Sequence, residues 1–367
     1  MYRLVRSVLF RFDAERSHRI ALRTLRWLCA IPGVPLLLRL VYGVANPALK
    51  THVMGIEFPN PVCLAAGLDK NADSVRALFA LGFGGIELGT VTPEPQPGNP
   101  PKRLFRVTRH HALINRLGFP SVGIDAFLEN LRRSGKPGPI GINVGKNRST
   151  ANENAVTDYV RSLRAVYAIA DYVVINVSSP NTPQLRALQN RENLGALLLA
   201  LKNEQVELGK TRSVFVPLAV KISPDLNDEQ INDIADLILE HKLDAVIATN
   251  STVERPGMEG ELLAAEAGGL SGRPLKDRST EVIRLLHRRL RGQVPIVGVG
   301  GIESADDAWE KMVAGADLIQ VYTGFIYQGP ALVRRICRGL LRRTRAAGCN
   351  TLEEAVAHAR SGVRMMR

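Results

Sequence analysis

Residues 172–182 read Tyr-Val-Val-Ile-Asn-Val-Ser-Ser-Pro-Asn-Thr, a short apolar run that ends in a cluster of small polar side chains. The run from Tyr172 to Val177 is rich in β-branched residues and lacks the strict alternation of a strand with one solvated face. Such continuous apolar character is typical of strands buried on both faces, as in a parallel sheet. The polar residues from Ser178 to Thr182 therefore follow the carboxyl end of a buried strand.

Seven other runs of this kind lie along the chain, and a stretch with helical periodicity follows each of them. Eight strand–helix units predict an α/β fold, the (β/α)₈ TIM barrel. An open doubly wound sheet is the alternative, but no G-x-G-x-x-G motif follows the first predicted strand. The predicted strands are Val62–Ala66, Gly85–Val91, Ile140–Val144, Tyr172–Val177, Val214–Ile222, Ala245–Thr249, Pro295–Val299 and Leu318–Tyr322, and the predicted helices lie around 71–81, 121–133, 152–169, 192–209, 228–241, 277–290, 304–314 and 330–344.

Three long insertions interrupt this regular pattern, at residues 92–120, 179–191 and 252–276. Each follows the carboxyl end of a predicted strand, which is the face where TIM barrels place their active sites. Long loops at that face are commonly lids or binding elements. We therefore expect the functional site at the carboxyl ends of the strands.

The amino-terminal part of the chain carries an unusual share of the positive charge. The whole chain of 367 residues has a net charge of +13, and residues 1–50 hold nine Lys and Arg against two acidic residues. Its apolar stretches are interrupted, so neither supplies the roughly 20 residues that a spanning helix needs. Basic amphipathic helices suit an interfacial membrane dock. The alternative is that they pack on the barrel and cap its core.

These patterns divide the chain into three parts. Residues 1–45 are expected to form an amphipathic helical segment for membrane docking. Residues 46–345 form the catalytic barrel, and residues 346–367 a helical tail. No apolar signal segment with a cleavage site is apparent, which favours a reducing, cytosolic compartment.

Composition also excludes several function classes. The cysteines, at 29, 63, 337 and 349, contain no C-x-x-C pair, which disfavours zinc and iron–sulfur sites. No Asp/Glu/His cluster has metal-ligand spacing and no G-x-S-x-G motif occurs, so metal-dependent hydrolysis and catalytic triads fit poorly. Aromatic residues are only 5% and the basic excess is terminal, which argues against a nucleic-acid partner.

The strand ends themselves carry an informative set of polar side chains. A single Asn there is usually a turn residue, but the repetition in this chain weakens that interpretation. Amide groups match the edges of a pyrimidine or flavin ring, and lysines suit a carboxylate or a reduced flavin. Glycines after the last two strands suit a phosphate bound by backbone N–H groups. The residues are Asp69, Lys70, Thr90, Asn143, Asn176, Ser178, Ser179, Asn181, Thr182, Lys221, Thr249, Asn250, Ser251, Gly300, Gly301, Tyr322, Thr323 and Gly324.

Seven motifs follow one another along the predicted barrel: Ala-Ala-Gly-Leu-Asp-Lys (65–70), Asn-Arg-Leu-Gly-Phe (115–119), Asn-Val-Ser-Ser-Pro-Asn-Thr (176–182), Lys-Ile-Ser-Pro-Asp (221–225), Thr-Asn-Ser-Thr (249–252), Gly-Gly-Leu-Ser-Gly (268–272) and Val-Gly-Val-Gly-Gly-Ile (297–302). Together they resemble the dihydroorotate dehydrogenase family. The basic amino-terminal segment resembles the extension of its class 2, quinone-dependent and membrane-associated branch. Ser179 stands where class 1 relatives carry a cysteine, which also favours class 2.

The resemblance implies an FMN enzyme of pyrimidine (UMP) biosynthesis. It would oxidise (S)-dihydroorotate to orotate and pass the electrons to a membrane quinone. It would be a monomer associated peripherally with the cytoplasmic face of the cell membrane through its amino-terminal helices. Two alternatives remain: a class 1-like FMN barrel that uses fumarate or a nicotinamide, and a non-enzymatic basic protein that binds membrane or nucleic acid.

The resemblance also assigns roles to individual residues. The catalytic residues are Ser179 as base, Thr182 as proton relay and Lys221 beside the flavin. The cofactor-binding residues are Ala66, Gly67, Thr90, Asn143, Asn176, Lys221, Thr249, Gly272, Gly301, Tyr322 and Thr323. The substrate-binding residues are Lys70, Asn115, Arg116, Leu117, Gly118, Phe119, Asn176, Asn181, Asn250 and Ser251. The quinone-site residues are His18, Arg106 and Tyr322, and no metal is implied.

Overall fold

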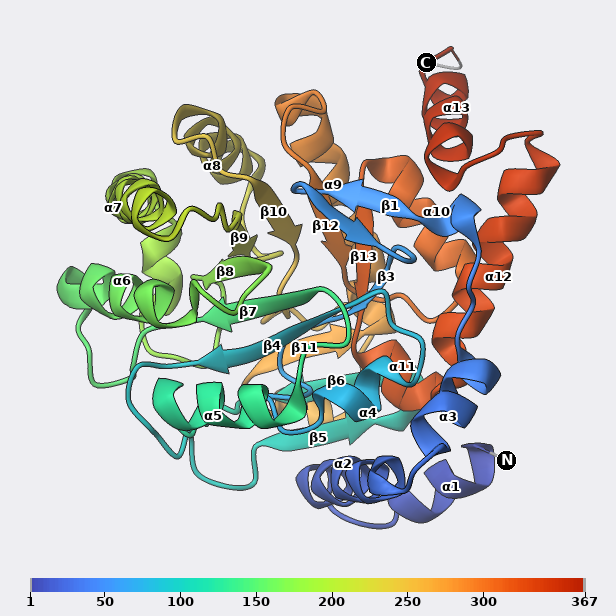
Figure 1. Cartoon of the computed structure of the whole chain (residues 1–367). Helices are drawn as coiled ribbons and strands as arrows, with labels where there is room; N and C mark the ends of the chain where they lie inside the picture. The colour runs from blue at the N-terminus through green and yellow to red at the C-terminus, as the bar shows by residue number, and fades with distance from the viewer. Residues whose placement is uncertain (1, 366–367) are drawn as a thin grey trace.

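The computed structural model describes residues 2–365 and is built around a closed barrel of parallel strands (Figure 1). The strands pair around the barrel in the order β10-β12-β13-β3-β4-β7-β8-β9. This closed order confirms the predicted TIM barrel and excludes the open sheet. The barrel strands are β3 (Val62–Leu64), β4 (Gly85–Val91), β7 (Ile140–Val144), β8 (Tyr172–Asn176), β9 (Leu218–Ile222), β10 (Ala245–Ala248), β12 (Ile296–Val299) and β13 (Leu318–Val321).

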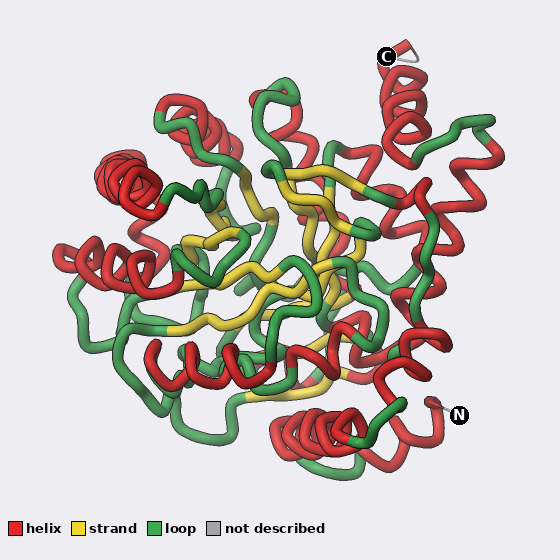
Figure 2. Tube along the Cα trace, viewed as in Figure 1, coloured by secondary structure: helices red, strands yellow, loops and turns green. Residues whose placement is uncertain are grey.

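Helices surround the strands, as the tube view shows (Figure 2). A short helix, α11 (Thr323–Gln328), which the sequence pattern did not predict, begins where β13 ends. Helix α13 (Leu352–Met365) occupies the expected tail, whose last two positions lie outside the described residues. The outer helices are α4 (Val75–Phe79), α5 (Ile124–Ser134), α6 (Ala155–Val166), α7 (Arg191–Arg212), α8 (Asp228–Glu240), α9 (Lys276–Leu290), α10 (Ala305–Ala314) and α12 (Ala331–Ala346).

The barrel interior is a packed core that is closed at its amino-terminal end by a β-hairpin. Strands β1 (Thr51–Val53) and β2 (Ile56–Phe58) pair antiparallel, and the Phe58 ring is fully buried among the inward-facing side chains. Packed layers of this kind are the rule inside TIM barrels. The sequence pattern does not predict this hairpin, because its strands are only three residues long.

One predicted strand was placed too early. The apolar run from Val214 predicts a strand from that residue, but β9 begins at Leu218. Val214 and Phe215 are 55% and 62% exposed, so they belong to the loop that enters the barrel. Their β-branched and aromatic character is shared with buried strands, and the run alone could not separate the two.

Two of the insertions are more ordered than expected. Residues 92–120 contain β5 (Leu104–Val107) and β6 (Ala112–Asn115), and residues 252–276 contain β11 (Gly269–Gly272). These strands form a separate three-stranded antiparallel sheet in the order β11-β6-β5. The prediction of plain loops was therefore incomplete, and the small sheet joins two insertions over the barrel mouth.

Three aspartates close the amino-terminal end of the barrel by the same contact. Each precedes a strand and accepts a hydrogen bond from the first backbone N–H of a neighbouring strand. Asp171 accepts from Ile140 at 2.7 Å, and Asp244 accepts from Leu218 at 2.8 Å. Asp317 accepts from Ile296 at 2.9 Å. These contacts satisfy donors that the parallel ladder leaves unpaired.

Substitution of one of these aspartates should reduce stability without disturbing the opposite, functional end. Asp244→Ala leaves the Leu218 N–H without its acceptor and removes one of the two acceptors of the Gln205 amide, which still donates to the Val216 carbonyl. We expect a loss of about 1–3 kcal/mol in unfolding free energy, as is usual for orphaned buried donors. Urea denaturation measures the loss, and Asp233→Ala, which removes only an exposed ion pair with Arg191, is the control. Equal stability of the two variants would contradict this role.

The amino-terminal segment forms three helices, α1 (Tyr2–Leu9), α2 (Ala14–Ala30) and α3 (Val34–Tyr42). In the view of Figure 1, α1 and α2 lie below the small sheet and α3 lies to its right. Helix α2 packs against α4 and β5, close to the mouth of the barrel. Within residues 2–365, no single helix combines the length and hydropathy of a membrane span. Helices α2 and α3 reach that threshold only as a pair bent by 115°.

Candidate active site

A cavity opens at the carboxyl ends of the barrel strands. It receives side chains from both ends of the chain's barrel sequence, from Ala65 to Gly324. The predicted site residues line it with five exceptions, namely Asn143, Arg116, Thr182, His18 and Arg106. The polar strand ends that are scattered through the sequence therefore converge on one space.

The floor of this cavity is a network of amide and hydroxyl groups. The Asn176 amide donates to the Thr90 hydroxyl and to the Asn143 carbonyl oxygen, both at 2.9 Å. The Thr90 hydroxyl also donates to the Asn143 carbonyl oxygen. Asn143 is fully buried and does not line the cavity, so it supports Thr90 and Asn176 of the floor from beneath.

Below the floor lies a buried ion pair that the sequence analysis missed. The Lys221 ammonium, which lines the cavity, is 3.3 Å from a carboxylate oxygen of Glu87. Glu87 is fully buried on β4 and also accepts from Asn143 at 2.7 Å and from the Gln320 amide on β13. The sequence feature that could have indicated this ion pair is the single acidic residue, Glu87, inside the apolar run from Gly85 to Val91.

The predicted base follows β8. Ser179 is 6% exposed and lines the cavity, and its hydroxyl oxygen accepts from the Asn181 backbone N–H at 3.3 Å. The neighbouring Ser178 has a different environment, because its hydroxyl donates to Asn176 and accepts from Asn250. The Thr182 hydroxyl is buried without a hydrogen-bond partner in the described part of the chain.

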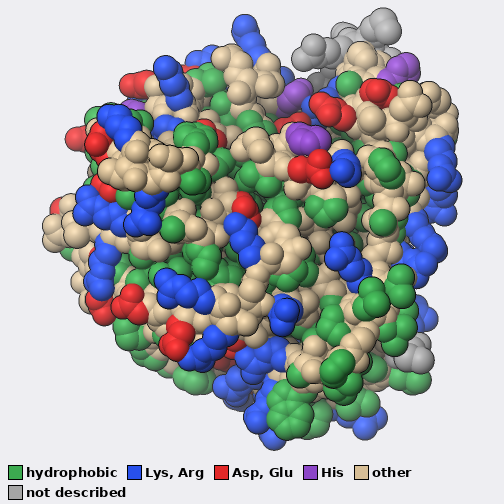
Figure 3. Space-filling view, in the orientation of Figure 1, with side chains coloured by type: hydrophobic (Ala, Val, Ile, Leu, Met, Phe, Trp, Pro, Cys, Tyr) green, Lys and Arg blue, Asp and Glu red, His purple; other side chains and the backbone are tan. Residues whose placement is uncertain are grey.

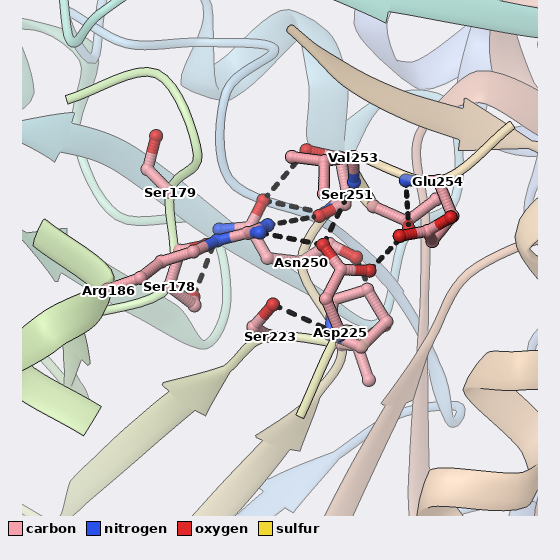
Figure 4. Close-up of polar contacts among 12 residues, drawn as sticks. Ser178, Ser179, Arg186, Ser223, Asp225, Asn250, Ser251, Val253 and Glu254 are labelled. Atoms are coloured by element: carbon pink, nitrogen blue, oxygen red, sulfur yellow. Dashed lines mark hydrogen bonds and ion pairs between the residues drawn. The ribbon is translucent and has the colours of Figure 1, made fainter. Parts of the chain in front are cut away.

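The loop that carries Ser179 is held by Arg186, another residue that the sequence analysis missed (Figure 4). Its guanidinium donates to the Ser178 carbonyl at 3.1 Å and to the Ser251 carbonyl at 2.8 Å. It also pairs with the Asp225 carboxylate at 2.6 Å. One partly buried cation thus ties together the loops after β8, β9 and β10.

The cavity wall nearest the small sheet carries donors that suit an anionic heterocycle. The Asn181 side-chain amide donates to the side-chain carbonyl oxygen of Asn115 at 2.9 Å, whereas the side-chain oxygen of Asn181 itself has no partner within residues 2–365. The Lys70 ammonium donates to the Gly67 carbonyl at 2.6 Å. Desolvation lowers the pKa of Lys70 to about 8. Arg116 points elsewhere, since it pairs with Glu266 and covers the Phe105 ring.

Glycines and a buried lysine shape the far end of the cavity. A Cβ atom on Gly301 would lie 2.4 Å from the Lys276 Cβ, and one on Gly272 would lie 2.3 Å from the His111 carbonyl oxygen. Only glycine therefore allows the backbone to pass so close at these positive-φ positions. Behind this segment, the Lys311 ammonium donates to the Lys276 carbonyl and to two hydroxyl groups in the first turns of α9. Such a backbone cradle suits a phosphate.

A second cavity lies between α2 and the barrel mouth, with about 1670 Å³ of open space. It shares Lys70, Leu117, Pro120 and Tyr322 with the first cavity, so the two adjoin. His18 lines it, and desolvation lowers the pKa of His18 to about 3, which keeps the imidazole neutral. Arg106 lies outside both cavities.

The Arg106 guanidinium instead binds the turn between α1 and α2. It donates to the Leu9 carbonyl at 3.4 Å and to the Phe10 carbonyl at 3.3 Å, and it contacts the Phe12 carbonyl. It also lies 4.6 Å from the centre of the Phe10 ring. Arg106 therefore orders the amino-terminal helices on β5.

Comparison with known proteins gives a family and a set of relatives. The family model described as dihydroorotate dehydrogenase matches residues 48–344. A protein of Chromobacterium violaceum named dihydroorotate dehydrogenase (quinone) is 54% identical over 340 residues, which cover 92% of this chain and 97% of that protein. A Methylobacillus flagellatus protein of the same name is 52% identical, with 93% and 99% covered. A crystal structure of DHODH from Eimeria tenella in complex with ferulenol is similar with a TM-score of 0.85 at 38% identity, and covers 94% of this chain and 95% of that chain.

Proposed function

Because this chain belongs to the dihydroorotate dehydrogenase family, we propose that it oxidises dihydroorotate in the cavity at its strand ends. It is a quinone-dependent FMN enzyme of pyrimidine biosynthesis that forms orotate. The relatives carry the word quinone in their names, so they give no support to fumarate or a nicotinamide as the electron acceptor, or to a non-enzymatic role. The observation that carries the proposal is the convergence of Ser179, Lys221 and the amide groups on one cavity.

The cavity fits FMN on three grounds of its own. It has glycine-lined backbone for a phosphate, an amide and hydroxyl floor for the ring edges, and an ammonium group at Lys221. When bound, FMN supplies a two-electron acceptor that takes hydride from C6 of dihydroorotate. The residues proposed to hold it are Ala66, Gly67, Thr90, Asn176, Lys221, Thr249, Gly272, Gly301, Tyr322 and Thr323, and Asn143 is proposed to act by supporting Thr90 and Asn176 from beneath.

The substrate is proposed to bind against the wall formed by the small sheet and the loops after β8 and β10. Asn181 retains an acceptor without a partner among the described residues, and its fixed amide pairs with Asn115. The Lys70 ammonium suits the orotate carboxylate. The proposed substrate residues are Lys70, Asn115, Leu117, Gly118, Phe119, Asn176, Asn181, Asn250 and Ser251, and Arg116 acts through its contact with Glu266 on the loop before β11.

Ser179 is proposed to remove the proton from C5 of dihydroorotate. A serine hydroxyl is a weak base, so the proton must leave Oγ as it arrives. The buried Thr182 hydroxyl, which lacks a partner in the described chain, is the proposed next acceptor through a water molecule. The Lys221 ammonium stabilises negative charge that develops at its end of the site.

The two halves of the proposed reaction, flavin reduction by dihydroorotate and flavin reoxidation by a quinone, can be measured separately. Anaerobic addition of dihydroorotate to the yellow enzyme should bleach the flavin absorbance, and a quinone should then restore it. Fumarate should not restore the absorbance. Restoration by fumarate alone would overturn the assignment of the acceptor.

The Lys70 environment predicts that orotate binding depends on pH. The folded-state pKa of Lys70 is lowered to about 8, so the ammonium is present below that pH and lost as pH rises through it. We expect orotate affinity, read from the perturbed flavin spectrum, to fall by about tenfold per pH unit above pH 8. Lys70→Met should bind weakly at all pH values and lose this dependence. Affinity that stays constant between pH 7 and pH 9.5 in the unaltered enzyme would contradict the role of Lys70.

The second cavity is proposed as the quinone path. It adjoins the first cavity at Tyr322, and its wall includes the neutral His18 and apolar side chains of α2 such as Ile20 and Leu22. Arg106 contributes by fixing the turn between α1 and α2. A quinone that leaves a membrane at α2 would reach the barrel mouth through this space.

Membrane association through the amino-terminal helices is proposed on the basis of their exposed apolar side chains. Trp27 is 70% exposed, and Leu36, Leu37 and Leu40 on α3 are 63%, 58% and 70% exposed. Figure 3 shows hydrophobic side chains gathered over these helices at the lower right, with Lys and Arg beside them. Helices of this type lie in the interface of a bilayer. We infer a monomer bound peripherally to the cytoplasmic face of the cell membrane.

A further inference from the structure

Glu87 is a fully buried glutamate, although glutamate side chains are seldom buried completely. In the eight barrel strands, all of which are described, Glu87 and Lys221 are the charged residues. The Glu87 side chain has no solvent exposure, whereas Lys221 reaches the cavity. A buried carboxylate is costly unless charge and hydrogen bonds compensate it. The retained carboxylate therefore calls for a specific role.

The first part of that role concerns Lys221. The ammonium lies 3.3 Å from Glu87 Oε1, while the Gln320 amide donates to Oε2. The three residues come from β9, β4 and β13, so the carboxylate is held across the barrel rather than by one neighbour. This arrangement fixes the ammonium end of the flexible Lys221 side chain where it reaches the cavity. It also places a negative charge that partly offsets the ammonium.

The second part concerns the direction of the hydrogen bonds in the floor. An ionised carboxylate only accepts, so the Asn143 amide nitrogen must face Glu87, at 2.7 Å. The Asn143 carbonyl oxygen then faces the cavity floor and accepts from Thr90 and from Asn176. Asn176 in turn presents its own carbonyl oxygen to Ser178 and Asn250. The donor and acceptor sides of the floor thus follow from one carboxylate.

We propose that Glu87 is a positioning residue that orients Lys221 and sets the donor–acceptor polarity of the Asn143, Thr90 and Asn176 network beneath the flavin. The inference rests on the proposed function, since it takes FMN to bind on this floor. Glu87 does not line the cavity, so it acts through Lys221 and Asn143 and not by contact with the ligands. Its charge lowers the tendency of the bound flavin to accept electrons, because it offsets the Lys221 ammonium.

The midpoint potential of the bound flavin tests this role. Glu87→Gln keeps the shape and removes the charge, so the Lys221 ammonium loses its counter-charge. We expect the equilibrium ratio of reduced to oxidised flavin to rise about tenfold, which for a two-electron couple is a rise of about 30 mV in the midpoint potential. Glu87→Asp keeps the charge and should hold the potential near that of the unaltered enzyme. An unchanged or lower potential in Glu87→Gln would overturn the proposal.

A second pair of variants separates this inference from the proposed function. Lys221→Met should lower the flavin potential. Adding Glu87→Gln to Lys221→Met should then change the ratio of reduced to oxidised flavin by less than about twofold, because the ammonium that Glu87 offsets is gone. If Lys221→Met leaves the potential unchanged, the proposed flavin position is wrong. If only Glu87→Gln has no effect, the Glu87 inference alone fails.

Two further measurements guard against a purely structural explanation. Should Glu87→Gln not fold, Glu87→Met also removes the charge at nearly the same side-chain length and should raise the potential in the same direction. Asp244→Asn, at the opposite end of the barrel, alters a carboxylate that also accepts several hydrogen bonds and should leave the potential unchanged. A shift in Asp244→Asn as large as that in Glu87→Gln would refute the specific role of Glu87.

Discussion

Ser179→Ala is expected to slow flavin reduction by dihydroorotate by about 10²–10⁴-fold, the usual contribution of a positioned general base. FMN should stay bound, because the cavity floor formed by Thr90, Asn143 and Asn176 does not involve the Ser179 hydroxyl. The fold should also be retained, since that hydroxyl accepts a single long hydrogen bond within the described residues, at 3.3 Å. Anaerobic stopped-flow measurement of flavin bleaching gives the rate directly.

Comparison with a second substitution makes this result specific. Ser179→Cys places a thiol, which can also accept a proton, at the same position and should be faster than Ser179→Ala. Reoxidation of chemically reduced enzyme by quinone should be unchanged in both variants, because it needs no proton from C5. If Ser179→Ala reduces its flavin at the rate of the unaltered enzyme, Ser179 is not the base.

The barrel could be predicted from the sequence because its strands are buried on both faces. Runs such as Gly85–Val91 and Tyr172–Val177 have no alternation and therefore differ from surface strands. The boundaries of the strands are predicted less accurately than their existence. Val214 and Phe215 show why, because an exposed apolar pair before a strand has the same composition as the strand. Burial decides between them, and burial depends on distant neighbours.

The small sheet could not be predicted for a related reason. Strand β11 pairs with β6 in the register Gly269–Asn115 to Gly272–Ala112, across more than half the barrel sequence. Each strand is only four residues long, and its stability comes from a partner that local periodicity does not specify. The sequence therefore predicted insertions at the right face without their internal order.

The candidate site was predictable where residues end strands and unpredictable where they support others. Ser179, Lys221 and Asn250 were selected because each directly ends or follows a buried run, and all three line the cavity. Arg186 and Gln320 were not selected, since an arginine in an insertion and a glutamine in an apolar run have many ordinary explanations. Their roles became visible only through contacts with Ser178, Ser251 and Glu87.

The amino-terminal helices give the second large expected effect. A variant with Leu36, Leu37 and Leu40 all replaced by Glu should lose binding to anionic liposomes by roughly 100-fold or more, because each buried leucine contributes about 1.5–3 kcal/mol. The three side chains are 58–70% exposed, so their replacement leaves the packing of the barrel unchanged. Flavin reduction by dihydroorotate should therefore stay at its original rate. Liposome co-sedimentation measures the binding.

Quinone turnover separates membrane docking from electron transfer in the same variant. Turnover with a long-chain quinone held in liposomes should fall with the binding, whereas turnover with a soluble short-chain quinone should persist, because the second cavity at His18 and Tyr322 is intact. Leu199→Glu, an exposed leucine on α7 that is 51% accessible, is the matched control and should affect neither measurement. Undiminished liposome binding by the triple variant would place the membrane contact elsewhere on the molecule.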